Sequence, residues 1–466
     1  MRRRFAAFVG ALALGALVLP VAAAAERPLT IGLTDPLFQS PSQPTRQQWL
    51  ARAKSANSDL VLLGASWAGI APGSRPPGFN PSNPADLNYD WAALDAAVRD
   101  SAQQGLRIVL LVTQSPSWAE GPHRPASAPA GTWKPKPPAL ADFGRAIARR
   151  YSGNYAGPGA PLPRVRRFQL WAEPNLSVYL TPQWRKRKPF APRHYRKMLR
   201  GFYDGVKRGQ RGANVISGGT APYGDPGVGG DRMQPVRFWR ELLCLKGQKL
   251  KTAKCRKPAK LDIVAHHPIN VGRPRRHALN RDDASTPDIG RVTRVVRKAL
   301  QTGRLLPRKR KPVWATEIWW DSKPPDSGGV PERQHARWLA ESFYLLWKQG
   351  VSAVVWFHIR DPESADLSAT QESGLYLKSG AAKQALRAFR FPFVTEATGG
   401  SSIRAWGRAP VAGRVKIQAK RRNGWRTVAR ERVKRHGVFT RTVRAPGKPA
   451  LRAVIGSRQS LPFKSR

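Results

Sequence analysis

The sequence RFQLWAEPN spans Arg167 to Asn175, and the sequence PVWATEIWW spans Pro312 to Trp320. Each stretch begins as a short run of β-forming residues and reaches a single glutamate, Glu173 or Glu317, with proline or aromatic residues soon after it. One glutamate at a strand end is usually solvated or paired in a salt bridge. Two glutamates in the same setting, each close to Trp, indicate instead a pair of carboxyl groups that act together.

Strands and helices alternate on both sides of these two stretches. Apolar runs predict eight strands, at residues 29–33, 59–67, 106–113, 167–173, 214–219, 261–268, 312–318 and 352–358. Helical patterns fall at residues 91–104, 139–151, 193–207, 289–303, 332–349 and 380–389. This alternation predicts an α/β fold, a (β/α)₈ TIM barrel over residues 26–393, with its active site at the carboxyl ends of the strands. No glycine-rich phosphate loop follows a strand, which disfavours an open sheet that binds a nucleotide cofactor.

The pattern changes near residue 394, where short strands separated by turn residues replace the alternation. We therefore predict a small antiparallel β-sandwich over residues 394–466. Residues 401–466 contain 19 Lys and Arg and one Glu. This domain is a candidate anchor for an anionic cell-wall polymer, and the alternative is a structural cap on the barrel.

The first 25 residues have the composition of a secretory signal peptide. Arg2, Arg3 and Arg4 precede an apolar run that ends in four alanines, residues 22–25. We expect cleavage near Glu26, a secreted or cell-wall-associated protein, and no membrane contact after cleavage. The alternative is an uncleaved membrane anchor, because the apolar run is almost long enough to span a bilayer.

The chain has only two cysteines, Cys244 and Cys255. In an exported protein two cysteines this close together predict a local disulfide. Two ligands are too few for a zinc site, so we expect no bound metal.

The net charge of the chain is +52. A charge of this sign favours contact with anionic wall polymers or uronic-acid polysaccharides. The alternative is an arginine-rich composition without a specific role, because the arginines are scattered along the chain. Aromatic and basic residues do not interleave as in a motif that reads nucleic acid, so no specific nucleic-acid partner is expected.

The paired glutamates and their Trp neighbours fit the chemistry of glycoside hydrolysis. That reaction needs one carboxylic acid to protonate the leaving oxygen and one carboxylate to act at the sugar carbon. Trp rings supply apolar faces for stacking on a sugar, and they raise the pKa of a nearby acid by excluding water.

The two glutamate stretches resemble those of the retaining clan of (β/α)₈ glycoside hydrolases that includes cellulase family 5 and β-xylosidase family 39. The resemblance extends over residues 29–393 and implies that Glu173 is the acid/base and Glu317 the nucleophile, with a carbohydrate substrate and no cofactor. Trp356 resembles the sugar-stacking Trp of strand eight. His266 and His267 fall where these enzymes place a residue that binds substrate or orients the nucleophile.

Nine residues are therefore candidates for binding the sugar: Trp67, Trp118, Trp171, Asn175, His266, His267, Trp319, Trp320 and Trp356. Two or three of the Trp rings are expected to be ordinary core residues. Each histidine is equally well explained as a hydrogen-bonded strand end.

One departure from the clan is important. The Asn that usually precedes the acid/base is Ala172 here, which removes an amide expected at the sugar 2-hydroxyl and predicts low activity or an unusual substrate. The leading hypothesis is a secreted retaining O-glycosidase that acts on a β-linked poly- or oligosaccharide. The alternatives are a weakly active or inactive barrel that binds surface polysaccharide, and, less well supported, a nucleic-acid binder.

Overall fold

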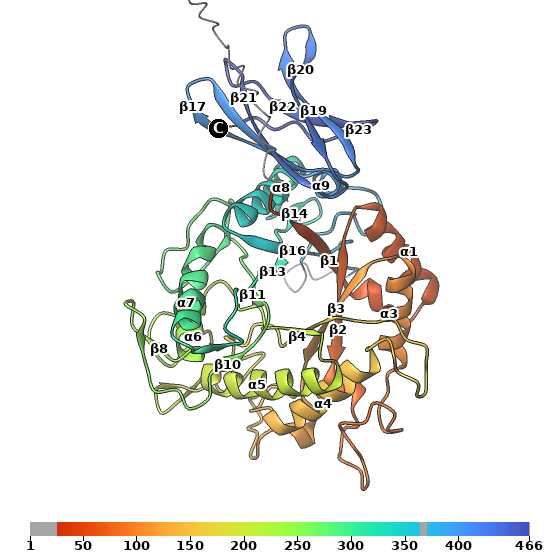
Figure 1. Cartoon of the computed structure of the whole chain (residues 1–466), viewed down its shortest axis with the longest axis vertical. Coiled ribbons are helices and arrows are strands. Elements are labelled where there is room, and N and C mark those ends of the chain that lie inside the picture. The colour runs from red at the N-terminus through yellow and green to blue at the C-terminus, as the bar shows by residue number, and fades with distance from the viewer. Residues whose placement is uncertain (1–25, 364–370, 466) are drawn as a thin grey trace, which may run out of the picture.

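The computed structural model describes residues 26–363 and 371–465, and the predicted signal peptide lies outside them. Eight parallel strands form its central sheet in the order β11-β13-β16-β1-β2-β3-β4-β7. Single backbone bridges, Ile216–Ile263 and Thr220–His266, join the two edge strands, so the sheet closes on itself. The strands are β1 (Thr30–Thr34), β2 (Leu60–Ser66), β3 (Arg107–Thr113), β4 (Arg167–Leu170), β7 (Asn214–Ile216), β11 (Val264–His266), β13 (Val313–Ile318) and β16 (Val351–Phe357). The predicted TIM barrel is confirmed (Figure 1).

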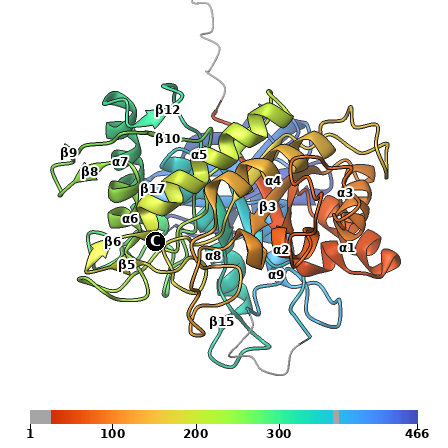
Figure 2. The same cartoon turned by 90° about the horizontal axis from the view of Figure 1, so that it is seen from below.

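Helices surround this barrel (Figures 1 and 2). They are α1 (Gln43–Ser55), α2 (Trp67–Ile70), α3 (Ala92–Gln103), α4 (Pro137–Arg150), α5 (Ala191–Gly209), α6 (Pro235–Leu242), α7 (Ile289–Gln301), α8 (Glu332–Lys348) and α9 (Gln384–Arg390). Three 3₁₀ turns lie at Pro36–Gln39, Ser117–Ala119 and Thr286–Asp288. Pairs of short strands lie in the loops: β5 (Trp184–Arg185) with β6 (Lys188–Pro189), β8 (Leu245–Lys246) with β9 (Lys251–Thr252), β10 (Ala259–Lys260) with β12 (Leu305–Leu306), and β14 (Ser322–Lys323) with β15 (Val330–Pro331).

Alternate residues of each barrel strand face opposite sides, as the pleat of a strand requires. One apolar cluster fills the inside of the barrel and includes Leu62, Val109, Trp314 and Val355. The residues between them pack outward against the helices in a second, larger cluster. The inside of the barrel is thus a packed core below the strand ends, and the site can form only at the mouth.

The C-terminal strands form two antiparallel sheets, in the orders β17-β18-β21 and β20-β19-β22-β23, as predicted. The strands are β17 (Phe393–Gly399), β18 (Ser402–Arg408), β19 (Gly413–Arg421), β20 (Gly424–Val433), β21 (Val438–Arg444), β22 (Leu451–Ile455) and β23 (Arg458–Gln459). The predicted boundary between residues 393 and 394 falls at the start of β17. These sheets lie beside α8 and α9 (Figure 1).

An ion pair joins the two parts of the chain. Arg408 has no exposed surface, and its Nη2 lies 2.5 Å from Oδ2 of Asp59, at the start of β2. His436 Nδ1 lies 2.6 Å from the other oxygen of Asp59. The pKa of Asp59 is lowered: burial opposes ionisation, but the hydrogen bond from His436 and the charge of Arg408 outweigh it.

Cys244 and Cys255 form the predicted disulfide. Within the described residues, none of the helices combines the length and the apolar character that crossing a membrane requires.

Candidate active site

Glu173 stands just beyond the end of β4, in an unusual backbone conformation. Trp171 has a φ of 71° and Glu173 a φ of 39°, both in the left-handed region that residues other than glycine rarely adopt. The Glu173 amide donates a hydrogen bond to Gly219 O at 2.8 Å, which ties this turn to the end of β7. Such conformations occur where the surrounding structure holds a functional side chain in place.

Glu317 is set by a bulge in β13. Ala315 pairs with Val354 and Ile318 pairs with Trp356, so three steps along β13 match two along β16. A bulge changes the direction of the side chains that follow it and often lies beside an active site. The indole N–H of Trp319 donates a hydrogen bond to Glu317 Oε1 at 3.1 Å.

The two glutamates meet at His267, which follows β11 directly. His267 Nδ1 lies 2.9 Å from Glu173 Oε1 and 3.8 Å from Glu317 Oε2. The sum of these distances, 6.7 Å, is the largest separation these two oxygens can have. The side chain of His267 is 3% exposed, against 15% for Glu173 and 26% for Glu317, so the carboxyl groups face the opening and the imidazole lies beneath them.

Burial and the charges of this site shift the pKa values of Glu317 and His267. Burial raises the pKa of Glu317, as does the charge of Glu173, while the charge of His267 and the hydrogen bond from Trp319 lower it. Burial opposes protonation of His267, but the charges of Glu317 and Glu173 and the hydrogen bond to Glu173 raise its pKa overall. Among the described residues, no lysine or arginine contributes to either shift.

Tyr179 is a site residue that the sequence analysis missed. It lies in the loop after Glu173 and is 43% exposed. Burial and the charges of Glu173 and Glu317 raise the pKa of its phenol, which places the hydroxyl within electrostatic reach of both carboxyl groups. Tyr179 is the one aromatic residue in positions 174–183, the stretch that follows Glu173. Its place there is the feature by which the sequence could have identified it.

Three of the predicted sugar-stacking rings are core residues, and their assignment was wrong. Trp67, Trp171 and Trp356 are at most 2% exposed. Trp67 stacks on Phe143 of α4, and Trp171 donates its indole N–H to Tyr179 O at 2.7 Å. No face of these rings is open to a ligand.

The register of β16 explains the error at Trp356. Val355 belongs to the cluster inside the barrel, whereas Trp356 packs outward against His335 and Trp320. Phe357, two residues beyond Val355 and partly exposed, is on the inward side at the barrel mouth. The aromatic residue that strand eight offers to the site is therefore Phe357.

The remaining Trp candidates differ in their burial and in the partners of their indole N–H groups. Trp118 is half-buried, donates its indole N–H to Pro72 O at 2.9 Å and packs edge-on against Trp67. Trp320 is 5% exposed and donates to Gly272 O at 2.8 Å. Trp319 is the member of this set that contacts a catalytic candidate.

Asn175 and His266 have structural roles, so their assignment as ligand contacts was also wrong. Asn175 is fully buried; its amide nitrogen donates to Met233 O at 2.9 Å, and its oxygen accepts from the Ala221 amide at 2.8 Å. His266 is fully buried between Thr220 Oγ1 (2.8 Å) and Ala284 O (2.7 Å). Burial lowers the pKa of His266 to about 4, which keeps it neutral.

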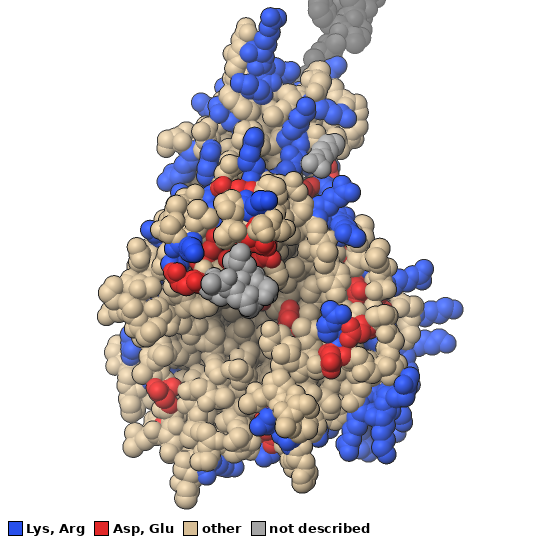
Figure 3. All heavy atoms as spheres, turned by 180° about the vertical axis from the view of Figure 1, so that it is seen from behind, with Lys and Arg blue, Asp and Glu red and all other residues tan. Residues whose placement is uncertain are grey.

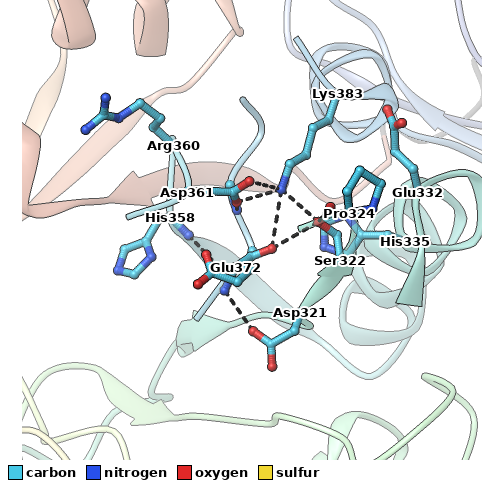
Figure 4. Close-up of polar contacts among 12 residues, drawn as sticks. Asp321, Ser322, Pro324, Glu332, His335, His358, Arg360, Asp361, Glu372 and Lys383 are labelled. Carbon is cyan, nitrogen blue, oxygen red and sulfur yellow. Dashed lines mark hydrogen bonds and ion pairs between the residues drawn. The ribbon is translucent and has the colours of Figure 1, made fainter. Parts of the chain in front are cut away.

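A buried lysine ties together the loops that follow β13 and β16 (Figure 4). Lys383 Nζ donates to Asp361 Oδ1 at 2.6 Å, to Ser322 Oγ at 2.7 Å and to Glu372 O at 3.3 Å. The side chains of Lys383 and Asp361 are each 1% exposed. Asp321 in turn accepts a hydrogen bond from the Glu372 amide at 2.9 Å. Because Ser322 lies five residues after Glu317, this network fixes the loop that carries Trp319.

The described residues contain no group of three His, Cys, Asp or Glu side chains that could hold a metal ion. That the reaction needs no metal or cofactor stays a prediction.

No protein-family model and no curated protein matches the sequence. Solved structures do match. A family 39 glycoside hydrolase from Bacteroides cellulosilyticus WH2 superimposes with a TM-score of 0.55 at 16% identity, over 90% of this chain and 79% of that one. A glucosidase from Croceicoccus marinus gives 0.51 at 15% identity, over 91% and 81% of the two chains. A GH5_18 protein from Streptomyces cattleya, solved in complex with GlcNAc, gives 0.50 at 16% identity, over 78% and 79%. The barrel fold implied by the resemblance to glycoside hydrolase families 5 and 39 is thereby confirmed.

Proposed function

We propose that this protein is a glycoside hydrolase that cleaves an O-glycosidic bond with retention of configuration at the anomeric carbon. The observation that supports this most strongly is the convergence of Glu173 and Glu317 on His267 Nδ1. Retaining enzymes hold their two carboxyl groups about 5 to 5.5 Å apart, whereas inverting enzymes need about 6.5 to 9.5 Å. The two oxygens that face His267 are at most 6.7 Å apart, a limit close to the shortest inverting separation. We infer the retaining arrangement from this limit together with the resemblance of the two glutamate stretches to those of retaining enzymes.

In the first step Glu173 donates its proton to the leaving oxygen while the carboxylate of Glu317 attacks the anomeric carbon. The bond from that carbon to the leaving oxygen breaks, and an ester between the sugar and Glu317 forms. In the second step Glu173, now ionised, takes a proton from water. The water oxygen attacks the anomeric carbon and releases Glu317 as a carboxylate.

His267 and Trp319 prepare Glu317 for the attack. Burial alone would favour the neutral, unreactive acid, and the positive charge of His267 and the N–H of Trp319 counter it by stabilising the carboxylate. His267 bonds Glu173 at the same time, so one imidazole holds both carboxyl groups in place.

The sugar next to the cleaved bond is a neutral one in this proposal. The charged groups that shift the pKa of Glu317 are His267 and Glu173, and a sugar carboxylate placed beside Glu173 and Glu317 would meet two groups of its own sign. In Figure 3 acidic side chains lie in and above the central hollow, and most Lys and Arg side chains project from the outer edges and the C-terminal domain, with some at the rim of the hollow. Tyr179, Trp319 and Phe357 are the proposed sugar contacts.

Ala172 should lower the rate. Its methyl group cannot hydrogen-bond a sugar hydroxyl, and contacts to the 2-hydroxyl strengthen in the transition state of such reactions by several kcal/mol. We expect slow turnover of aryl β-glycosides, above background.

Azide distinguishes the two glutamates. In Glu173→Ala the sugar ester on Glu317 can still form, and azide should accept the sugar to give a β-glycosyl azide from a β-glycoside. In Glu317→Ala azide should replace the nucleophile and give the α-glycosyl azide. Products of the same anomeric form from both variants, or a variant with wild-type turnover, would contradict the assignment.

A second candidate function rests on Ala172 and on the basic C-terminal domain. In it the barrel binds a cell-surface polysaccharide with little hydrolysis, and the domain attaches to an anionic wall polymer. Export through residues 1–25 belongs to both candidates. A wild-type protein that binds polymer as tightly as Glu317→Gln, and releases no aglycone from any aryl glycoside, would favour this second function.

A further inference from the structure

A basic groove of about 840 Å³ lies on the outer wall of the barrel, between α4, α5 and the loop closed by the disulfide. Seven cationic side chains line it: Arg196, Lys197, Arg200, Arg208, Lys254, Arg256 and Lys257. The one acidic residue in its lining is Asp204, which already pairs with Lys260 at 2.7 Å. None of these residues takes part in the candidate active site.

The fold builds this groove from two rigid parts. Helices α4 and α5 lie side by side (Figure 2) at unusually close range, because a Cβ at Gly205 would lie 2.0 Å from Ala141 O. Gly201 and Gly209, one turn away on either side, make the same approach. Lys254 lies inside the loop that the disulfide closes, and Arg256 and Lys257 follow Cys255 directly. Arg200 Nη1 donates to Pro258 O at 2.6 Å, which holds this segment on α5.

Like charges crowd together in this groove. Burial lowers the pKa of Arg196 and the charge of Arg193 lowers it further; Glu241 opposes this shift, and Arg200 adds to it. Positive charges held together in this way cost folding energy that an anion would recover.

A second Arg-lined cavity provides a contrast. It lies between the barrel and the C-terminal domain, and there Arg275 pairs with Glu341 at 2.5 Å and with Glu396 at 3.6 Å. In this second cavity, acidic side chains thus pair with an arginine of the lining. The basic groove differs, because the one acidic residue in its lining already pairs with Lys260.

We propose that the basic groove binds an anionic polysaccharide, whose carboxylate or phosphate groups pair with its lysines and arginines. Arginine presents a planar set of donors that fits both groups. None of the described residues that line the groove is aromatic, so it offers no surface on which nucleic-acid bases could stack. This inference goes beyond the proposed hydrolysis and does not depend on it.

The groove runs along the side of the barrel. Pro137 begins α4, and in a (β/α)₈ barrel the helices begin at the face where the strands end. Lys254, Arg256 and Lys257 lie in the connection from α6 back to β11, which is toward the opposite face. The groove is therefore an outer-wall site, separate from the catalytic mouth.

The test compares two triple variants of the full chain. Lys254→Gln, Arg256→Gln and Lys257→Gln together remove three exposed charges from the groove. The matched control, Arg294→Gln, Arg297→Gln and Arg333→Gln, removes three exposed charges from α7 and α8, outside both the groove and the C-terminal domain. The probe is a fluorescently labelled polygalacturonate, with binding measured by anisotropy at several salt concentrations, and thermal unfolding checks that both variants fold like wild type.

We expect the groove variant to lose at least about tenfold in affinity and to show a weaker dependence on salt, and the control to lose less than about threefold. Equal losses in the two variants would overturn the proposal, because binding would then follow the net charge. Binding of the neutral methyl ester as tightly as of the free acid would overturn it too. So would an oligonucleotide of equal charge that binds the groove more tightly than the polyuronate.

Turnover of aryl glycosides separates this proposal from the proposed function. The groove variant should keep wild-type turnover. If the wild type hydrolyses nothing, the difference in polymer binding between the two triple variants must still appear.

Discussion

Gly219 leaves the space that the imidazole of His267 occupies: a Cβ at Gly219 would lie 2.1 Å from His267 Nε2. It would also lie 2.8 Å from Thr316 Oγ1, just before Glu317. The segment that follows β7 thus determines where the histidine lies between the two glutamates.

Gly219→Ala should displace His267 and lower kcat/KM by about 100-fold, because a shift of about 1 Å in a catalytic group can cost that much. Steady-state kinetics on an aryl glycoside measures the effect. The control is Gly290→Ala in α7, where an added Cβ meets no atom within 4 Å. Wild-type activity in Gly219→Ala would show that the position of His267 does not matter.

His267→Asn should move the acid limb of the pH profile of kcat/KM to higher pH. The charge of His267 lowers the pKa of Glu317, so its removal lets burial and Glu173 raise that pKa further. The reaction needs Glu317 ionised, so the pH at which activity appears should rise. An unmoved limb, or one at lower pH, would contradict the proposed role of His267.

Phe357→Ala should change mainly the kinetics of the enzyme, and Trp356→Ala mainly its stability. Phe357→Ala should raise KM or lower kcat/KM with a small change in stability, because Phe357 is partly exposed at the mouth. Trp356→Ala should lower the free energy of unfolding by about 3 to 5 kcal/mol, since the ring is fully buried. Urea unfolding measures the stability of both variants, and steady-state kinetics measures their KM and kcat/KM. Loss of sugar binding in Trp356→Ala at unchanged stability would restore the original assignment of that ring.

Asp59 should make stability depend on pH. Its pKa is lowered in the folded protein, so its contribution is fully present above the ordinary aspartate pKa and is lost as the pH falls through the folded value. Asp59→Asn should remove this part of the acid dependence. Arg408→Leu, which leaves Asp59 without its buried partner, should cost about 3 kcal/mol at neutral pH. Urea unfolding at several pH values measures both, and a parallel acid loss in wild type and Asp59→Asn would contradict this account.

The sequence predicted the barrel because its apolar runs recur with helical patterns between them, and each predicted strand overlaps an observed one. It did not predict α6, which is only eight residues long. The error at Trp356 has a physical reason: residues 353–357 are apolar throughout, so the sequence does not reveal which of them face inward.

The site was harder to predict than the fold. Glu173 and Glu317 were found because each lies at or just beyond the end of a strand, and His267 because it follows β11. Tyr179 comes from a loop whose path depends on the left-handed turn at Trp171 and Glu173, which no residue type there requires. Asn175 and His266 were misassigned because their polar atoms are occupied by hydrogen bonds within the protein. The partners, Met233 and Ala284, are distant in the sequence, so the sequence alone does not reveal these bonds.

The central claim, that Glu317 forms a bond to the sugar while Glu173 handles the proton, is tested most directly by trapping. Wild-type protein is treated with an activated 2-deoxy-2-fluoro glycoside of whichever sugar it releases from an aryl glycoside, then digested and analysed by mass spectrometry. We predict one added sugar on the peptide that contains Glu317, and none in Glu317→Gln. A sugar attached to another residue, or a product of inverted configuration with no attached sugar, would contradict the mechanism.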